Sequence, residues 1–253
     1  MSETTFFNIL LIAWFMLAAV IFVSLFFIVA PYGRHSRRRW GPQIRDRLGW
    51  IIMEAPSAIG FALFFALGIN HISLTAVAFL ILWEAHYVHR AFIYPFSRRA
   101  GASGMAVSVV SMGFIFNIGN AYLNGRYLFT LSGGYSNSWL LTPQFVIGAV
   151  LFIIGFFINR WADDSLRSLR RPGESGYKIP MGGLYRWISC PNYFGEMLAW
   201  TGWAVATWSL PGLAFAVFTA ANLAPRARAH HLWYKQQFAD YPPQRKALVP
   251  AIW

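Results

Sequence analysis

Residues 6–30 read FFNILLIAWFMLAAVIFVSLFFIVA, a stretch of 25 residues without a charged side chain. A helix that crosses a bilayer needs about 20 consecutive apolar residues, so this stretch is long enough to span a membrane by itself. No basic residue precedes it and no convincing small-residue cleavage site follows it. We therefore expect a retained helix and not a signal peptide, and the stretch predicts an integral membrane protein.

The rest of the chain has the same apolar character. Hydrophobic residues make up 57% of the sequence and charged residues 12%, whereas soluble domains carry about 25% charged residues. The third and seventh apolar stretches are short, so we expect them to continue into their polar flanks. The predicted fold is all-α, a polytopic membrane protein with seven transmembrane helices. The six stretches that follow the first are 50–68, 72–83, 105–123 and 143–157, with two more in 193–223 separated near Leu210-Pro211-Gly212.

Basic residues are distributed unevenly over the predicted loops. With seven spans, 20 of the 21 Lys and Arg residues fall on one side, and Arg126 falls on the other. The positive-inside rule makes the basic side cytosolic, which puts the N-terminus outside and the C-terminus in the cytosol. The net charge of +12 then lies on one face, where it can attract anionic lipid or bind a nucleotide with several phosphates. No nucleic-acid-binding motif is present, so nucleic acid is not an expected partner.

The cofactor chemistry is limited by motifs that the sequence lacks. Cys190 is the only cysteine, so neither a disulfide within the chain nor a thiolate metal cluster can form, and we expect no metal site. No Gly-x-Gly-x-x-Gly motif follows a strand pattern, and no P-loop is present. A nucleotide would therefore have to bind to a different kind of fold.

Three carboxylates lie inside predicted spans, where ionisable groups are costly and usually face a cavity or a partner. They are Glu54, Glu84 and Glu196. Glu54 could make a helix-to-helix hydrogen bond, or it could be a buried acid directed at a reacting carbonyl and kept protonated by desolvation. Tyr87 follows Glu84 by three residues; it is either an interfacial aromatic residue or a phenol that donates a proton to a carbonyl oxygen.

Polar residues also recur at helical spacing in three separate places near the predicted cytosolic edge. Such a stripe is either a row of surface ion pairs or a ligand-facing wall, in which Arg binds phosphate and Asp or Asn binds hydroxyls or a carboxamide. Because three helices carry stripes at the same edge, we expect a polar ligand there, with its reactive end directed into the bundle. The stripes are Asn159, Asp163, Arg167 and Arg170; Asn192, Glu196 and Trp200; and Arg226, His230 and Tyr234.

Seven segments, from the first loop to the C-terminus, resemble the steroid 5α-reductase family. The block that runs from Pro172 to Leu184 and the C-terminal ending are the most specific of them. The segments are PYGRH (31–35), EAPS (54–57), HYVHR (86–90), LRRPGESGYKIPMGGL (169–184), NYFGE (192–196), ATWSLP (206–211) and YPPQRKALVP (241–250).

The resemblance implies a seven-helix enzyme that uses NADPH to reduce the 4,5 double bond of a 3-keto-4-ene steroid. In this family hydride passes from the nicotinamide to C5, and the C3 carbonyl is held by a Glu and a Tyr that match Glu54 and Tyr87. We expect one domain over residues 1–253, with the substrate-side helices in 1–158 and mainly cofactor-binding segments in 159–253.

By the same resemblance, Trp50 and Trp200 line the steroid pocket. The implied cofactor contacts are Asn159, Asp163, Arg167, Arg170, Tyr177, Asn192, Glu196, Arg226, His230 and Tyr234, together with Tyr32, Arg34, Tyr94 and Arg99 in more variable loops. The sequence departs from the family pattern at Arg37-Arg-Arg39, in the loop 125–142 and at Arg228.

Several alternatives stay open at this point. The substrate could be another lipid enone, an enoyl-thioester or a sterol ring double bond. The chain could instead be a membrane methyltransferase that binds S-adenosylmethionine, or a lipid-binding scaffold without a cofactor. We expect a monomer in the cytoplasmic membrane of a bacterium, which the excess of Arg over Lys favours, or in the endoplasmic reticulum membrane if the source is eukaryotic. The sequence does not give the physiological substrate.

Overall fold

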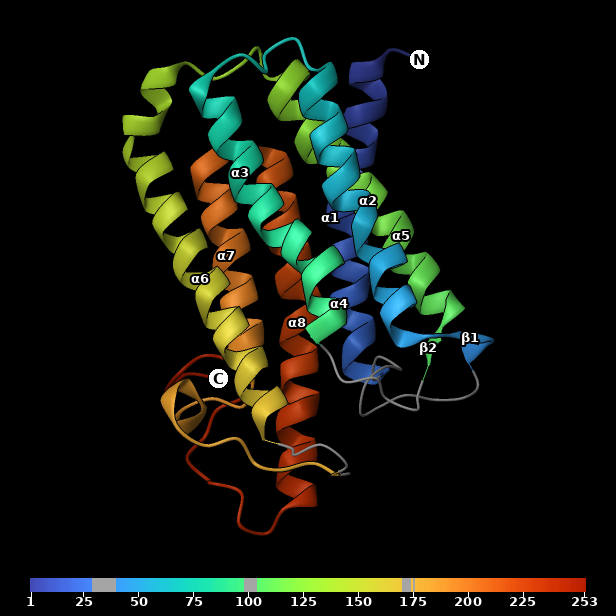
Figure 1. The fold of residues 1–253 in the computed structure, drawn as a ribbon, viewed down its shortest axis with the longest axis vertical. Helices are drawn as coiled ribbons and strands as arrows, with labels where there is room; N and C mark the ends of the chain where they lie inside the picture. Colours follow the sequence, from blue (N-terminus) through green and yellow to red (C-terminus); the bar gives the residue numbers. More distant parts are fainter. Residues whose placement is uncertain (29–39, 98–103, 170–173, 175) are drawn as a thin grey trace. The chain divides into compact units, whose positions relative to one another are not determined.

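The computed structural model describes residues 1–28, 40–97, 104–169, 174 and 176–253, and most of these residues lie in helices (Figure 1). The chain divides into two compact units. Unit 1 contains residues 1–13, 30–146 and 207–212, and unit 2 contains residues 14–29, 147–206 and 213–253. The expectation of a single domain stays a prediction.

Most of the described residues of each predicted apolar stretch lie in helices. The remaining elements are short helical turns and one antiparallel pair of two-residue strands, β1 and β2. The elements are α1 (Glu3–Phe27), β1 (Gln43–Ile44), α2 (Asp46–Leu67), α3 (Leu74–Val88), η3 (His89–Ile93), α4 (Tyr94–Ser97), β2 (Met105–Ala106), α5 (Val107–Ala121), η4 (Tyr122–Leu131), η5 (Asn137–Leu141), α6 (Pro143–Ser168), η6 (Gly183–Arg186), α7 (Pro191–Thr207) and α8 (Leu210–Gln237).

The two short apolar stretches continue into polar sequence, as predicted. The third becomes α3, which runs without a break through the π-helix η3 and α4 to Ser97. The seventh becomes α8, which continues beyond Leu223 to Gln237. By length and composition, α1, α2 and α6 are each long and apolar enough to cross a membrane. The full set of seven spans stays a prediction.

One ion pair bears on the predicted orientation. The Arg126 Nε atom lies 2.6 Å from Oε1 of Glu3, and its Nη2 atom donates to Oε2 at 2.9 Å. Arg126 is the one basic residue that the charge pattern assigned to the side of the N-terminus. The contact, which lies within unit 1, agrees with the placement of Arg126 on the side of the N-terminus. The assignment of this side to the exterior stays a prediction.

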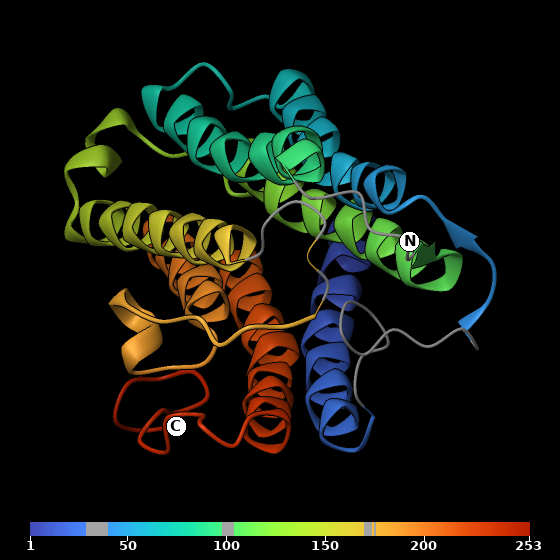
Figure 2. The ribbon, with the colours of Figure 1, turned by 60° about the horizontal axis from the view of Figure 1, so that its bottom comes forward.

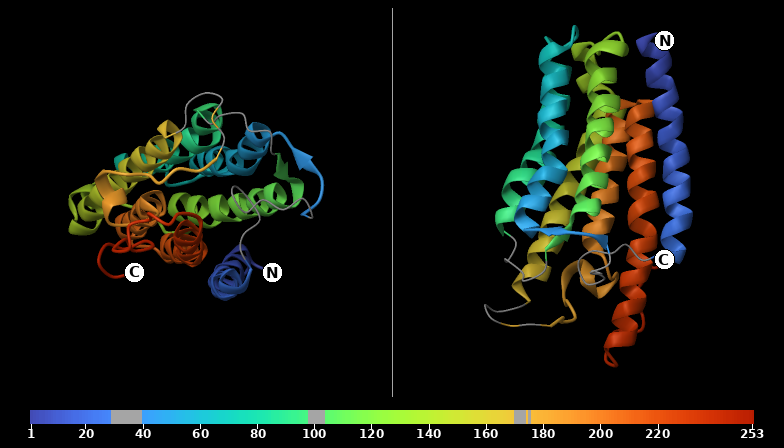
Figure 3. Two further views of the ribbon diagram at one scale, coloured as in Figure 1. Left: turned by 90° about the horizontal axis from the view of Figure 1, so that it is seen from below. Right: turned by 90° about the vertical axis from the view of Figure 1, so that its right-hand side faces the viewer.

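In unit 1, α2 and α5 lie side by side, with β1 and β2 at one end (Figure 3). The approach is close at Gly113, where an added Cβ would lie 2.3 Å from Cγ of Met53. Aromatic rings fill the space toward α3, because Phe61 stacks on Trp83 with ring centroids 4.4 Å apart. This packing brings the polar face of α5 against Glu54 on α2.

In unit 2, α6, α7 and α8 lie next to one another (Figure 2). Glycines bring the backbones of α6 and α7 together. A Cβ at Gly155 would lie 2.3 Å from the Ala199 nitrogen, and a Cβ at Gly195 would lie 2.5 Å from the Asn159 nitrogen. Small residues at helix interfaces allow this kind of close approach in membrane proteins. As a result, the side chain of Asn159 can reach polar groups on α7.

Candidate functional site

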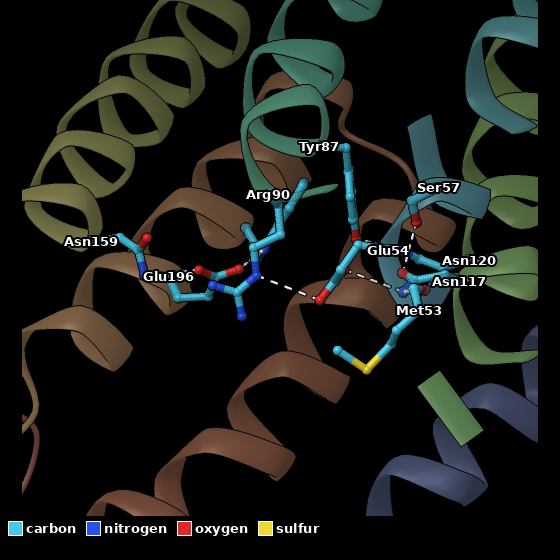
Figure 4. A network of polar contacts seen from close by, with 10 residues as sticks. Met53, Glu54, Ser57, Tyr87, Arg90, Asn117, Asn120, Asn159 and Glu196 are labelled. Carbon is cyan, nitrogen blue, oxygen red and sulfur yellow. Dashed lines mark hydrogen bonds and ion pairs between the residues drawn. The ribbon is translucent and has the colours of Figure 1, made fainter. Parts of the chain in front are cut away.

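Glu54 lies on α2 in a buried polar environment within unit 1 (Figure 4). One carboxylate oxygen accepts a hydrogen bond from Nδ2 of Asn117 at 3.3 Å. The other lies 3.5 Å from Nε of Arg90. Both neighbours carry hydrogen-bond donors, and Arg90 is the charged group beside Glu54. The protonated state of Glu54 stays a prediction.

Tyr87 is 3% exposed, and its ring packs against Trp83. Its hydroxyl oxygen accepts a hydrogen bond from Nδ2 of Asn120 at 3.3 Å. In Figure 4 the Tyr87 side chain is directed toward Glu54 and the two asparagines of α5. An interfacial aromatic residue would be expected to face lipid or headgroups. The burial of Tyr87 within a polar cluster supports the alternative, a phenol with a chemical role.

Asn117 and Asn120 are three residues apart on α5, so they face the same side of the helix. Asn117 holds Glu54 and Asn120 holds Tyr87. Ser57 adds a bond from its hydroxyl to Oδ1 of Asn117 at 2.7 Å. We call Glu54, Ser57, Tyr87, Arg90, Asn117 and Asn120 the Glu54 cluster. It places an acid and a phenol, from different helices, in one buried network.

The Arg90 guanidinium is also held by aromatic rings. It lies 4.7 Å from the centroid of the Trp50 ring and 5.2 Å from that of Tyr94. Trp50 and Tyr94 contact each other edge to face. Arg90 lies in the π-helix η3, a rare geometry that is frequent at functional sites. Trp50 and Tyr94, which the family resemblance implicated in ligand binding, are thus brought together beside the Glu54 cluster.

Unit 2 contains a second polar network, between α6 and α7. Asn159 donates to Oε2 of Glu196 at 2.9 Å and to the Asn192 carbonyl at 2.9 Å. Asn192 donates to Oδ1 of Asp163 at 2.9 Å. Trp200 donates from its indole to Oε1 of Glu196 at 2.9 Å. We call these five residues the Glu196 cluster, in which residues of the first two stripes contact one another.

A third set of polar side chains comes from α7 and α8. The Tyr193 hydroxyl lies 3.1 Å from Nη2 of Arg226 and 3.1 Å from Nε2 of His230. Asn222 also binds Arg226, at 3.2 Å. Arg226 and His230, four residues apart on α8, therefore present a guanidinium and an imidazole on one face. This pair of groups suits a phosphate.

The other predicted contacts of unit 2 have different surroundings. Arg167 forms an ion pair with Asp164, and both side chains are partly exposed, which supports the surface-pair interpretation for that contact. Tyr234 is 2% exposed and stacks on Tyr241. Tyr177 is exposed, with its ring edge against Trp233. Four predicted contacts lie outside the described residues: Tyr32, Arg34, Arg99 and Arg170.

A buried hydrogen-bond network that joins Ser189, α8 and the segment after α8 was not predicted. The Ser189 hydroxyl lies 2.6 Å from Nδ1 of His231 and 2.6 Å from the Tyr241 hydroxyl. Burial lowers the pKa of His231 to about 4, and Lys235 and Lys246 act in the same direction. Burial also raises the pKa of Tyr241. The network connects the end of α8 to residues 187–190, so it supports the face that carries His230.

Sequence reasoning also missed Asn117 and Asn120. The available signal was two amides, three residues apart, inside the apolar stretch 105–123. Buried amides need partners, so their presence in a span already indicated a polar surface on a neighbouring helix. Neither amide is ionisable, so a pattern of charged residues within spans does not include them.

Known proteins are similar to this chain over most or all of its length. Residues 103–253 match the family model described as 3-oxo-5-alpha-steroid 4-dehydrogenase. The chain belongs to this family. The steroid 5-alpha-reductase DET2 of Gossypium hirsutum is 40% identical to it over 256 residues, which cover 100% of this chain and 99% of the relative.

Two animal relatives give the same result. The 3-oxo-5-alpha-steroid 4-dehydrogenase 1 of Rattus norvegicus is 38% identical and covers 93% of this chain and 91% of its own length. The human protein of the same name is 39% identical and covers 87% of this chain and 85% of its own length. The chain is therefore a member of an oxidoreductase family of steroid metabolism, with helices suited to a membrane.

Proposed function

We propose that this chain reduces the 4,5 double bond of 3-keto-4-ene steroids with NADPH as the hydride donor. The observation that carries the proposal is the Glu54 cluster, in which a buried phenol and a buried carboxylate from two helices are held by adjacent amides of a third. Family membership and the printed names of the relatives support the reaction and the class of substrate. Bound NADPH would supply the hydride.

Tyr87 acts at the steroid carbonyl. When C5 of the enone accepts a hydride, the electron pair of the 4,5 bond moves toward C3, and the carbonyl oxygen gains negative charge. A hydrogen-bond donor placed at that oxygen stabilises the charge, and the phenol can pass its proton to it. One proton from water then reaches C4, the ketone is restored, and the phenol is reprotonated. The net change is the addition of one hydride and one proton.

Glu54 acts beside Tyr87. Asn117 Nδ2 and Arg90 Nε lie 3.3 and 3.5 Å from its two oxygens. In the ionised form it orients the donors around the carbonyl, and after taking up a proton it becomes a donor itself. Replacement by Gln removes both the charge and the releasable proton, while the shape is kept.

The donor set of unit 2 fits a phosphorylated dinucleotide. The Glu196 cluster offers two carboxamides and two carboxylates, which suit ribose hydroxyls and an amide. Arg226 and His230 offer cationic or donor groups for phosphate. Asn159, Asp163, Asn192, Glu196, Arg226 and His230 would hold the cofactor, with Tyr177, Tyr234, Arg167 and the residues outside the described ranges as further proposed contacts. Trp50 and Trp200 are proposed to line the steroid site.

The proposal includes a membrane setting. The lipid-soluble substrate would enter from the bilayer, the protein would span it seven times as a monomer, and the C-terminus would face the cytosol. The three helices that are long and apolar enough to cross a membrane support this. So does the contact of Arg126 with Glu3.

The direct test is turnover by the purified, detergent-solubilised protein. We expect NADPH oxidation that depends on progesterone, a 3-keto-4-ene steroid, with a 5α-reduced product. Thermal stabilisation by NADPH but not by S-adenosylmethionine is also expected, since a ligand that binds the folded state raises its stability. Stabilisation by S-adenosylmethionine alone would assign the chain to the methyltransferases, and stabilisation by neither would favour a scaffold.

A further inference from the structure

We propose that Asn120 is a positioning residue for the reduction: its amide donates to the phenol oxygen of Tyr87 and stabilises the negative charge that reaches this oxygen when Tyr87 gives up its proton. The inference rests on the proposed role of Tyr87 in the reaction. It starts from the 3.3 Å contact between Nδ2 of Asn120 and the Tyr87 oxygen, which Figure 4 shows within the Glu54 cluster.

Neighbouring groups determine which end of the Asn120 amide faces Tyr87. Nδ2 of Asn124 lies 3.1 Å from the main-chain oxygen of Asn120 and 3.1 Å from its Oδ1 atom. A main-chain carbonyl only accepts hydrogen bonds, so the Asn124 atom that faces it must be the nitrogen. That nitrogen also faces Oδ1 of Asn120. The other end of the Asn120 amide, its NH₂ group, is therefore the end directed at Tyr87.

The direction of this bond matters for the chemistry. Asn120 supplies the hydrogen, so the contact does not use the phenol proton that the proposed reaction needs. As that proton moves toward the steroid oxygen, the Tyr87 oxygen becomes negative, and hydrogen bonds to a charged acceptor are about twice as strong as neutral ones. The contact is thus stronger in the transition state than in the ground state, which is the condition for a rate effect.

The surroundings strengthen the contact. Asn120 is 0% exposed, Asn124 1% and Tyr87 3%, and electrostatic interactions are stronger where water is excluded. The bond that Asn124 donates to Oδ1 polarises the Asn120 amide in the same direction. Asn117, one turn earlier, donates from Nδ2 to the Met53 carbonyl at 2.7 Å, and it contacts Glu54 instead of Tyr87. Each of the two amides thus holds one proposed reactive group.

A double-mutant cycle separates this role from simple packing. The variants are Asn120→Ala, Tyr87→Phe and the combination, assayed with NADPH and progesterone. We expect Asn120→Ala to lower kcat about tenfold or more, the scale of a hydrogen bond to a charged group, with KM for progesterone changed about twofold or less. In the Tyr87→Phe background the same substitution should change kcat by about twofold or less, because the oxygen it serves is absent.

Two further variants keep the test decisive. Asn120→Leu has the same number of side-chain heavy atoms and the same branching at Cγ, so it removes the amide without leaving a cavity, and it replaces Asn120→Ala if that variant does not fold. Thr75→Val is the control, because Thr75 is 0% exposed on α3 and donates to the Ser136 carbonyl, away from Tyr87. We expect Thr75→Val to lower the unfolding temperature with little change in kcat.

The outcomes are distinguishable. A loss of kcat from Asn120→Ala or Asn120→Leu that is equally large with and without the Tyr87 hydroxyl would overturn the role of Asn120 and leave the proposed function intact. A wild-type rate in Tyr87→Phe alone would remove the proposed role of Tyr87, and the inference would fall with it. A kcat effect confined to the background that retains the hydroxyl supports the proposal.

Discussion

The Glu54 cluster and the Glu196 cluster are built from similar side chains but differ in burial. Glu54, Tyr87 and the two amides of α5 are almost fully buried, and each amide contacts one of the other two groups at 3.3 Å. The carboxylates and amides of the Glu196 cluster are half-buried, except Trp200, and their contacts are 2.9 Å. The first is a dry set of polar groups, and the second is a half-open one.

This difference suggests a division of work. A dry site strengthens the electrostatic interactions that change during a reaction, so changes in the Glu54 cluster should act mainly on kcat. A half-open, pre-organised wall loses little freedom when it binds a polar ligand, so changes in the Glu196 cluster should act mainly on cofactor affinity.

The largest expected effect is in the Glu54 cluster. Tyr87→Phe and Glu54→Gln should each lower kcat for progesterone by about 10²-fold, the usual scale for a lost proton donor or oxyanion contact. Steady-state kinetics at saturating NADPH measures this. Tyr135→Phe is the matched control: its hydroxyl donates to the Thr207 carbonyl at 2.7 Å, so its loss should reduce stability and spare kcat. Near-normal rates in both site variants would refute the assignment.

The Glu196 cluster should respond in affinity. Glu196 accepts bonds from Asn159 at one oxygen and from Trp200 at the other. In Glu196→Gln one of these donors would face an NH₂ group, so we expect about tenfold weaker NADPH binding, which corresponds to one unsatisfied hydrogen bond. Titration of tryptophan fluorescence measures it, with Glu3→Gln as the control in unit 1. A reduced kcat with unchanged affinity would contradict the division.

Helix packing gives a third, smaller contrast. Gly195→Ala places a Cβ 2.5 Å from the Asn159 backbone nitrogen, whereas Gly60→Ala places one 3.1 Å from the Cβ of Ala121. Backbone cannot yield as a side chain can, so Gly195→Ala should cost about 1–3 kcal/mol of stability and also weaken NADPH binding. Gly60→Ala should cost less and leave NADPH binding unchanged. Thermal unfolding with and without NADPH compares them, and equal behaviour would mean that the α6–α7 approach does not shape the Glu196 cluster.

The smallest effect concerns pH. The pKa of His231 is lowered from 6.5 to about 4. Between these two pH values the ring is neutral in the folded protein and protonated in the unfolded chain. The contribution to stability is complete above pH 6.5 and is lost as the pH falls toward 4. His231→Asn keeps a polar group near Ser189 without a titrating proton, so its unfolding temperature should fall less steeply over this range. Equal slopes for both proteins would assign the pH dependence to other groups.

The sequence was sufficient to predict the helices but not the contacts between distant segments. Uninterrupted apolar stretches of about 20 residues have few alternatives to a helix in a membrane protein, and the stretches 6–30 and 143–157 became α1 and α6. Helical spacing put Asn159 and Glu196 each on a polar stripe, and in the structure these two side chains contact each other.

Contacts between distant segments could not be predicted in this way. The approach of Arg90 to Glu54 depends on the π-helical turn at 89–93, which hydrophobic periodicity does not reveal. The network of Ser189, His231 and Tyr241 depends on where the C-terminal segment packs. The guanidinium of Arg90 beside Glu54 was not predicted either, because the packing of two helical segments decides whether a charge lies nearby.

The most direct measurement is which carbon of the steroid product carries deuterium after turnover with labelled NADPH or in D₂O. Progesterone is incubated with the purified protein and NADPH that carries deuterium at the transferable position of C4 of the nicotinamide, and separately with unlabelled NADPH in D₂O. We predict deuterium at C5 of the 5α-product in the first case and at C4 of the steroid in the second. Deuterium that reaches C5 from D₂O, or the absence of a 5α-reduced product with NADPH, would contradict hydride transfer to an enone whose carbonyl is held by Tyr87 and Glu54.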